Sequence, residues 1–173
     1  KEGRTYFPIN AGIGLNSGDC CVGNMGSEQR FDYSVLGDEV NLASRLEGQS
    51  KVYGVDIVIG SKTHDQAQGF ATLELDLIRV KGKMVPARIF ALLGDNNMQQ
   101  DSQFKELLKL HEEMLKSYRL QDWPKARQLL SGCEKLDGFG LGKFHALYRQ
   151  RMAAFEKDPP GIKWDGVYIA TAK

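Results

Sequence analysis

The sequence predicts an α+β fold in which short strands and two helices form one layered unit and a small helical tail follows. Apolar segments with alternating polar residues fill the N-terminal part of the chain. The alternation ends in a polar stretch at residues 93–102, and beyond it apolar residues recur at helical spacing. We therefore place a boundary near Asn97, with one unit at residues 1–97 and a helical extension at residues 98–173.

Apolar runs bounded by glycines and polar clusters predict the strands of the first unit. These strands lie at residues 9–16, 20–23, 33–36, 56–59, 73–80 and 87–92. A helix is predicted at residues 38–53, because Asp38 is a good N-cap residue and Val40, Ala43 and Leu46 form an apolar stripe. A second helix is predicted at residues 62–68.

Three helices are predicted in the tail. The first has capping candidates in Asp101 and Ser102. Its apolar face is formed by Phe104, Leu107, Leu108, His111, Met114, Leu115 and Tyr118. The second follows the cap Asp122, has a proline in its first turn and carries Ala126, Leu129, Leu130 and Cys133. The third follows a glycine-rich loop and carries Phe144, Tyr148, Met152 and Phe155.

Composition disfavours several classes of protein. The chain has 173 residues, 42% hydrophobic and 26% charged, which is typical of a globular protein with a real core. A net charge of +1 without a basic cluster disfavours binding to a nucleic acid polymer. No apolar run approaches the roughly 20 residues of a membrane span. The chain does not begin with methionine, so we expect a piece of a longer protein. We expect this piece to be cytoplasmic and leave open whether the whole protein is tethered to a membrane.

The cysteines and histidines do not predict a metal centre. Cys20, Cys21 and Cys133 are odd in number and lack C-x-x-C spacing, which disfavours a disulfide framework or a zinc site. We expect buried, inert thiols in a reducing compartment. The histidines have no partners at ligand spacing, and we expect His111 to be a packing residue.

The glycine-rich segment at residues 12–26 fits neither of the nucleotide-binding templates that its composition suggests. The dinucleotide fingerprint needs G-x-G-x-x-G before a helix, whereas this segment reads G-x-G-x-x-x-G before a strand-like Cys-Cys-Val. A P-loop needs G-K followed by Ser or Thr, which the segment lacks. We expect its glycines to serve a tight hairpin between two strands.

Asn41 and Arg45 are the strongest candidates for a binding function. They lie four residues apart on one face of the predicted helix, directly after a strand and a glycine. A guanidinium offers a planar fork of donors for phosphoryl oxygens, so the pair suits a ribose and its phosphates. Glu39 in the first turn disfavours phosphate binding by the helix N-terminus, so the contact should run through Arg45. An ordinary amphipathic helix remains the alternative interpretation.

Three ordered motifs resemble the C-terminal half of the class III adenylate and guanylate cyclase catalytic domain. They are residues 11–18 with 23–26, residues 33–47, and residues 80–83 followed by 87–92. The resemblance implies a partial ferredoxin-like fold with a mixed β-sheet and helices. It also implies formation of cyclic AMP or cyclic GMP, in sites that two cyclase domains share, with two magnesium or manganese ions.

The resemblance assigns roles to four residues. Asn41 matches the asparagine that orients the ribose, and Arg45 matches the arginine that stabilises the transition state at phosphorus. Lys81 matches the lysine that holds the triphosphate. Ser34 falls where the family reads the base, and its hydroxyl favours ATP, because it can accept a hydrogen bond from the adenine amino group.

The family's two metal-binding aspartates and its base-reading lysine belong to the N-terminal half of the domain. None of the matching motifs in this sequence comes from that half. Asp19, Asp32 and Asp38 lie in the wrong motifs to replace them. We therefore expect Mg²⁺ or Mn²⁺ to be held outside these residues, and the isolated fragment to be inactive. An exposed strand edge and apolar face should make it dimerise or exchange strands, unless the tail covers that face, and a second cyclase domain is the expected partner.

The tail is similar to the helical C-terminal extension of some bacterial adenylate cyclases, through residues 118–126 and 158–169. Its helical hairpin resembles one tetratricopeptide unit, which cannot bury its apolar face alone, so it should pack on the first unit or on a partner protein. Trp123 and Trp164 are expected to be packing anchors. The alternative function is a non-catalytic cyclase-like module that binds a nucleotide or a protein.

Overall fold

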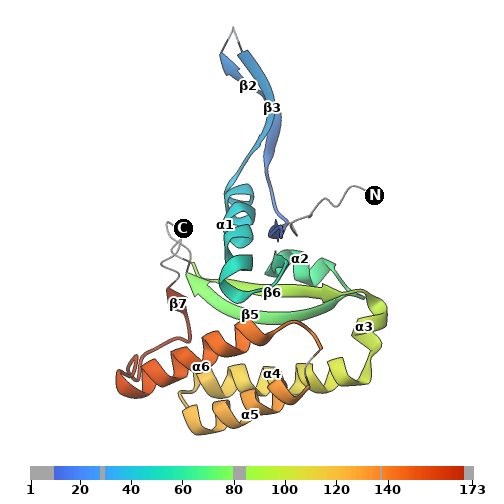
Figure 1. Ribbon diagram of the computed structural model, residues 1–173. Coiled ribbons are helices and arrows are strands. Elements are labelled where there is room, and N and C mark those ends of the chain that lie inside the picture. Colours follow the sequence, from blue (N-terminus) through green and yellow to red (C-terminus); the bar gives the residue numbers. More distant parts are fainter. Residues whose placement is uncertain (1–9, 28–29, 80–84, 137, 170–173) are drawn as a thin grey trace, which may run out of the picture.

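The computed structural model describes residues 10–27, 30–79, 85–136 and 138–169 (Figure 1). In chain order the elements are β1 (Ile13–Leu15), β2 (Cys21–Ser27), β3 (Arg30–Leu36), α1 (Asp38–Tyr53), β4 (Ile57–Gly60), α2 (Ser61–Gln66), β5 (Ala71–Arg79), β6 (Ala87–Gly94), α3 (Asn96–Gln100), α4 (Ser102–Arg119), α5 (Trp123–Lys135), α6 (Gly142–Lys157) and β7 (Tyr168–Ile169). Each predicted element has a counterpart, and the bounds of α1 are those predicted. The short elements α3 and β7 were not predicted.

A mixed five-stranded sheet, in the order β1-β4-β6-β5-β7, forms the middle layer. The pairs β1–β4 and β5–β7 are parallel, whereas β6 is antiparallel to both β4 and β5. Helices α1 and α2 lie on one face, and α4, α5 and α6 lie on the other (Figure 1). The predicted α+β class is thus confirmed. No helix of the described residues is long and apolar enough to cross a membrane.

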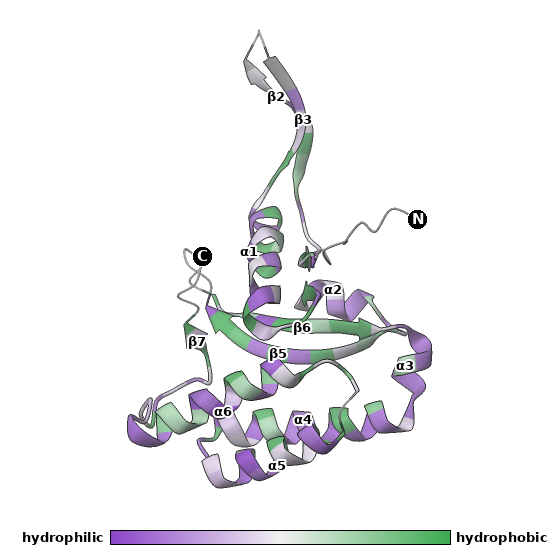
Figure 2. Ribbon diagram, in the orientation of Figure 1, coloured by the Kyte–Doolittle hydropathy of each residue, from purple (hydrophilic) through white to green (hydrophobic). Residues whose placement is uncertain are grey.

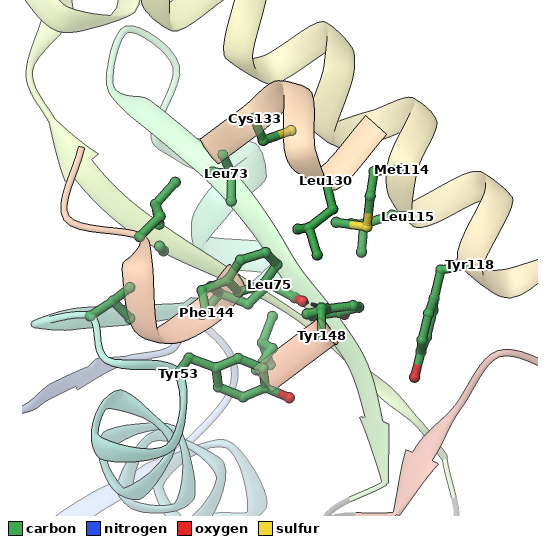
Figure 3. Close-up of a cluster of buried hydrophobic side chains, with 14 of the residues drawn as sticks. Tyr53, Leu73, Leu75, Met114, Leu115, Tyr118, Leu130, Cys133, Phe144 and Tyr148 are labelled. Carbon is green, nitrogen blue, oxygen red and sulfur yellow. Dashed lines mark hydrogen bonds between the residues drawn. The ribbon is translucent and has the colours of Figure 1, made fainter. Parts of the chain in front are cut away.

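One continuous core joins the sheet to the helical tail. Apolar residues of β5 and β6 lie between the two helical layers (Figure 2). Leu73 and Leu75 of β5 belong to the same buried cluster as Phe144 and Tyr148 of α6 (Figure 3). The hydroxyl of Tyr148 donates a hydrogen bond to the carbonyl of Leu75 at 2.8 Å. The tail therefore packs on the first unit. Packing on this unit and packing on a partner protein were the two arrangements expected from its apolar face.

The aromatic side chains of the tail also gather into one cluster. The ring centroid of Tyr118 lies 5.6 Å from that of Trp123 and 5.4 Å from that of Trp164. Phe155 packs against both tryptophans. Both tryptophans are packing residues, as the sequence predicts, and they fasten the segment after α6 to the helical layer.

His111 is fully buried within this tail, and its packing role is confirmed. Its Nε2–H donates to the carbonyl of Glu74 at 2.6 Å, and its ring lies 5.2 Å from that of Phe144. Nδ1 is buried with no hydrogen-bond partner among the described residues. Burial therefore lowers the pKa of His111 to about 4, because the charged form would lose its hydration.

The expected hairpin between the first two strands is wrong. β1 pairs with β4 in parallel, and β2 pairs with β3 in a separate two-stranded ribbon. The glycines of the first strand instead allow α1 to approach it closely. A Cβ at Gly14 would lie 2.2 Å from the carbonyl oxygen of Ala43, and one at Gly12 would lie 2.1 Å from the hydroxyl of Ser50. These glycines position α1.

Two further expectations need correction. Asp38 is the first residue of α1 and not its cap, since Gly37 occupies the N-cap position and no side chain caps the helix. Cys20 and Cys21 are exposed, and only Cys133 is buried. The exposure of the first two follows from their place at the base of the β2–β3 ribbon, which projects away from the sheet (Figure 1).

Candidate active site

Asn41 and Arg45 lie on one exposed side of α1, beside the stripe that anchors the helix. Leu42 and Leu46 are buried against the sheet, and the adjacent positions on the helix leave Asn41 exposed and Arg45 half-buried. Neither side chain has a hydrogen bond or an ion pair with another described residue. Both polar groups are therefore available to a ligand, and neither is turned into the core.

Ser34 lies on β3, four residues before the start of α1, and its side chain is half-buried. It is directly opposite Gly23 in the antiparallel ribbon, so the two share one face. A Cβ at Gly23 would meet nothing within 4 Å. The face of the ribbon that carries Ser34 thus has open space at Gly23, on the neighbouring strand.

The other face of the ribbon is apolar and exposed. Val22 is opposite Val35, and Asn24 is opposite Tyr33. Of these, the side chain of Tyr33 is 77% exposed. An exposed apolar face of this kind is typical of a surface that another protein covers.

The N-terminal end of α1 is held in place by contacts that the sequence analysis missed. The side-chain amide of Asn16, directly after β1, donates to the carbonyl of Glu39 at 3.1 Å and to its carboxylate at 2.6 Å. Lys62 at the start of α2 lies 3.6 Å from the same carboxylate. An asparagine directly after an apolar strand was the only sequence signal for this contact.

A cavity of about 240 Å³ lies next to these contacts. Its lining includes Asn16, Glu39, Lys62 and Arg88, but not Asn41 or Arg45. Asn41 and Arg45 therefore lie outside the lining of this cavity. Lys81, the remaining candidate, lies outside the described residues.

The described residues do not build a metal site. No group of three or more His, Cys, Asp or Glu side chains within them could hold an ion. Asp19 and Asp32 belong to the ribbon and its base, and Asp38 begins α1, so the three carboxylates lie along different elements. The divalent ions of the expected reaction do not fit the residues that the structure describes.

The structure brings together a strand, a glycine and a helix that presents an amide and a guanidinium on one face, which is the arrangement of the cyclase-like motif at residues 33–47. The chain belongs to the adenylate and guanylate cyclase catalytic domain family, whose model matches residues 3–97. That match ends where the helical extension was predicted to begin.

Relatives named adenylate cyclase come from bacteria and from Dictyostelium discoideum. The chain is 40% identical over 88 residues to an adenylate cyclase of Anabaena cylindrica, covering 48% of this chain and 18% of that protein. It is 32% identical over 94 residues to adenylate cyclase 1 of Rhizobium meliloti, covering 54% and 13%. The chain thus spans less than a fifth of these relatives. Among solved structures, the adenylyl cyclase CyaB of P. aeruginosa is 34% identical, covering 47% of this chain and 41% of that one, with a TM-score of 0.42.

Proposed function

We propose that this chain supplies the ribose- and phosphate-contacting side of a site that converts ATP into cyclic AMP and diphosphate. In this reaction the ribose 3′-hydroxyl gives up its proton to water and its oxygen bonds to the α-phosphorus, which closes the ring. The bond from that phosphorus to the bridging oxygen breaks, and diphosphate leaves with its electron pair. Asn41 orients the ribose so that the 3′-oxygen is in line with the departing oxygen. Arg45 stabilises the negative charge that develops on the phosphoryl oxygens. The observation that carries the proposal is that Asn41, which is exposed, and Arg45, which is half-buried, share one helix face without a side-chain partner among the described residues.

Ser34 reads the base in this proposal. Its hydroxyl accepts a hydrogen bond from the adenine amino group, while the open position at Gly23 leaves room for the ring beside the strand. A hydroxyl can also donate, so its preference for adenine over guanine is modest. Lys81 would hold the triphosphate, although it lies outside the described residues.

The residues assigned here contact the nucleotide from one side only, so the proposal includes a second cyclase domain that contacts it from the opposite side. The apolar face of the ribbon and the half-exposed side chains of Ile13 and Leu15 on the edge strand β1 support such a partner. A second copy of the same domain is the simplest occupant. The C-terminal extension packs on the sheet, so it needs no partner of its own to bury its apolar face.

The catalytic ions, Mg²⁺ or Mn²⁺, would be held by carboxylates outside the described residues. We accordingly expect residues 1–173 alone to be inactive. The side chains assigned here bind and orient the nucleotide and stabilise charge; they do not replace the ions.

The proposal is tested in a protein that joins residues 1–173 to the metal-binding half of a cyclase domain. Arg45→Ala should lower kcat by about 10²-fold or more with a small change in KM, because the contact forms in the transition state. Arg149→Ala, on the exposed side of α6, is the matched control and should retain full activity. Full activity in Arg45→Ala would refute the assignment. Nucleotide binding without any turnover in the unsubstituted protein would favour the non-catalytic module.

A further inference from the structure

A buried polar network joins the C-terminal extension to the helix that carries Asn41 and Arg45. Arg151 donates from Nη1 to Oδ2 of Asp76 at 2.5 Å and from Nη2 to the hydroxyl of Tyr53 at 3.3 Å. The hydroxyl of Tyr53 itself donates to the same carboxylate oxygen at 2.7 Å.

The other oxygen and the guanidinium face are also occupied. Oδ1 of Asp76 accepts the backbone N–H of Leu77 at 2.8 Å. The guanidinium carbon of Arg151 lies 3.4 Å from the ring centroid of Tyr168. Tyr53 ends α1, Asp76 lies on β5, Arg151 lies on α6 and Tyr168 lies on β7, so four elements meet around the ion pair of Asp76 and Arg151.

Helix α6 touches the C-terminal end of α1 at a second place. The ammonium of Lys143 donates to the carbonyl of Lys51 at 2.5 Å, where a cation suits the negative end of the helix dipole. A Cβ at Gly54 would lie 2.5 Å from Cβ of Lys143. The ring of Tyr53 also lies beside that of Phe144, with centroids 6.3 Å apart (Figure 3).

Asp76 is buried because of an irregularity in its strand. The register of β5 against β6 shifts between Glu74 and Asp76, so Leu75 and Asp76 are both buried although they are neighbours. A buried carboxylate that loses a donor is left with an unmet charge, which resists any movement of Tyr53 or Arg151 away from it. The end of α1 is therefore fixed to the extension by charge as well as by packing.

We propose that the C-terminal extension positions α1 for catalysis through Tyr53, Asp76 and Arg151, which act as positioning residues and touch no substrate. This inference rests on the proposed cyclase function. Asn41 precedes Tyr53 by twelve residues, or about 18 Å along a helix. A tilt of α1 of about 3° at Tyr53 would move Asn41 by about 1 Å, and a misplacement of that size can reduce turnover by up to about 10²-fold.

Tyr53→Phe tests the link, because it removes one hydroxyl and keeps the ion pair. Its control is Tyr33→Phe, since the side chain of Tyr33 is 77% exposed on the ribbon and takes no part in this network. Amide hydrogen exchange is measured by mass spectrometry on peptides within residues 38–53. We expect exchange about tenfold faster in Tyr53→Phe and unchanged in Tyr33→Phe. Arg151→Lys, which keeps the charge but loses the fork of donors, should also accelerate exchange. Rates equal to the control in both variants would overturn the link.

Turnover is then measured in the joined protein described above. Tyr53→Phe should lower kcat by about tenfold with KM within about twofold, since Asn41 and Arg45 act in the transition state. Faster exchange in α1 with unchanged kcat would overturn the positioning role. If the unsubstituted protein shows no turnover, the proposed function fails, and the exchange rates alone decide whether the extension holds α1.

Discussion

Arg151→Met should destabilise the fold far more than removal of an arginine elsewhere on the same helix. The side chains of Arg151 and Asp76 are 5% and 1% exposed, so water cannot screen or replace their interaction. The substitution keeps most of the apolar volume but leaves the carboxylate of Asp76 buried without its cation. Breaking a buried pair in this way costs about 3–5 kcal/mol. Arg149→Met breaks an exposed pair with Glu134, which should cost less than about 1 kcal/mol.

The assay is unfolding by urea, followed by tryptophan fluorescence and by circular dichroism. Unchanged slopes against urea concentration would show that the difference in midpoint reflects stability. The double variant Asp76→Asn with Arg151→Met removes both charges. Its free energy of unfolding should be about 2 kcal/mol higher than the value expected from adding the effects of the two single substitutions. The reasoning is refuted if Arg151→Met and Arg149→Met have free energies of unfolding within about 1 kcal/mol of each other.

Three other predictions follow from the same structure. Gly14→Ala should cost about 1–3 kcal/mol in urea unfolding, because its Cβ would meet the backbone at Ala43, whereas Gly23→Ala, which opens onto free space, should be nearly neutral. Between about pH 6.5 and 4 the unfolded chain binds a proton at His111 that the native chain does not, so the free energy of unfolding should fall by about 3 kcal/mol as the pH drops through that window. His111→Gln should reduce this dependence of the free energy of unfolding on pH. A thiol reagent should label two cysteines in the native protein and Cys133 only after unfolding, since burial raises the pKa of its thiol to about 11.

Local patterns predicted the elements well, because the signals for them are local. The apolar stripe of α1, the cap and proline at the start of α5, and the alternation along β5 each lie within a few residues. The pairing of β1 was not predictable in this way. Its partner β4 follows the whole ribbon and α1, and the glycines that a hairpin seemed to require make room for a helix that comes later in the chain.

The candidate site was predictable only in part, for the same reason. Asn41 and Arg45 share a helix face by their spacing alone. The residues that hold this helix at its two ends, Asn16 and Arg151, contact partners 23 and 75 residues away in the chain. The only hint in the sequence that Arg151 is buried is its place on the apolar side of its helix, next to Met152.

The projecting ribbon formed by β2 and β3 has a consequence for substrate selectivity. Two strands without a third are marginal in water, and this ribbon is attached to the rest of the described chain only at its base (Figure 1). The side chain proposed to distinguish adenine from guanine therefore stands on an element that the proposed second subunit should stiffen by resting against it. Dilution should reduce the preference for ATP over GTP before it abolishes turnover. Substrate selectivity would then depend on protein concentration, because concentration sets how much of the protein is assembled.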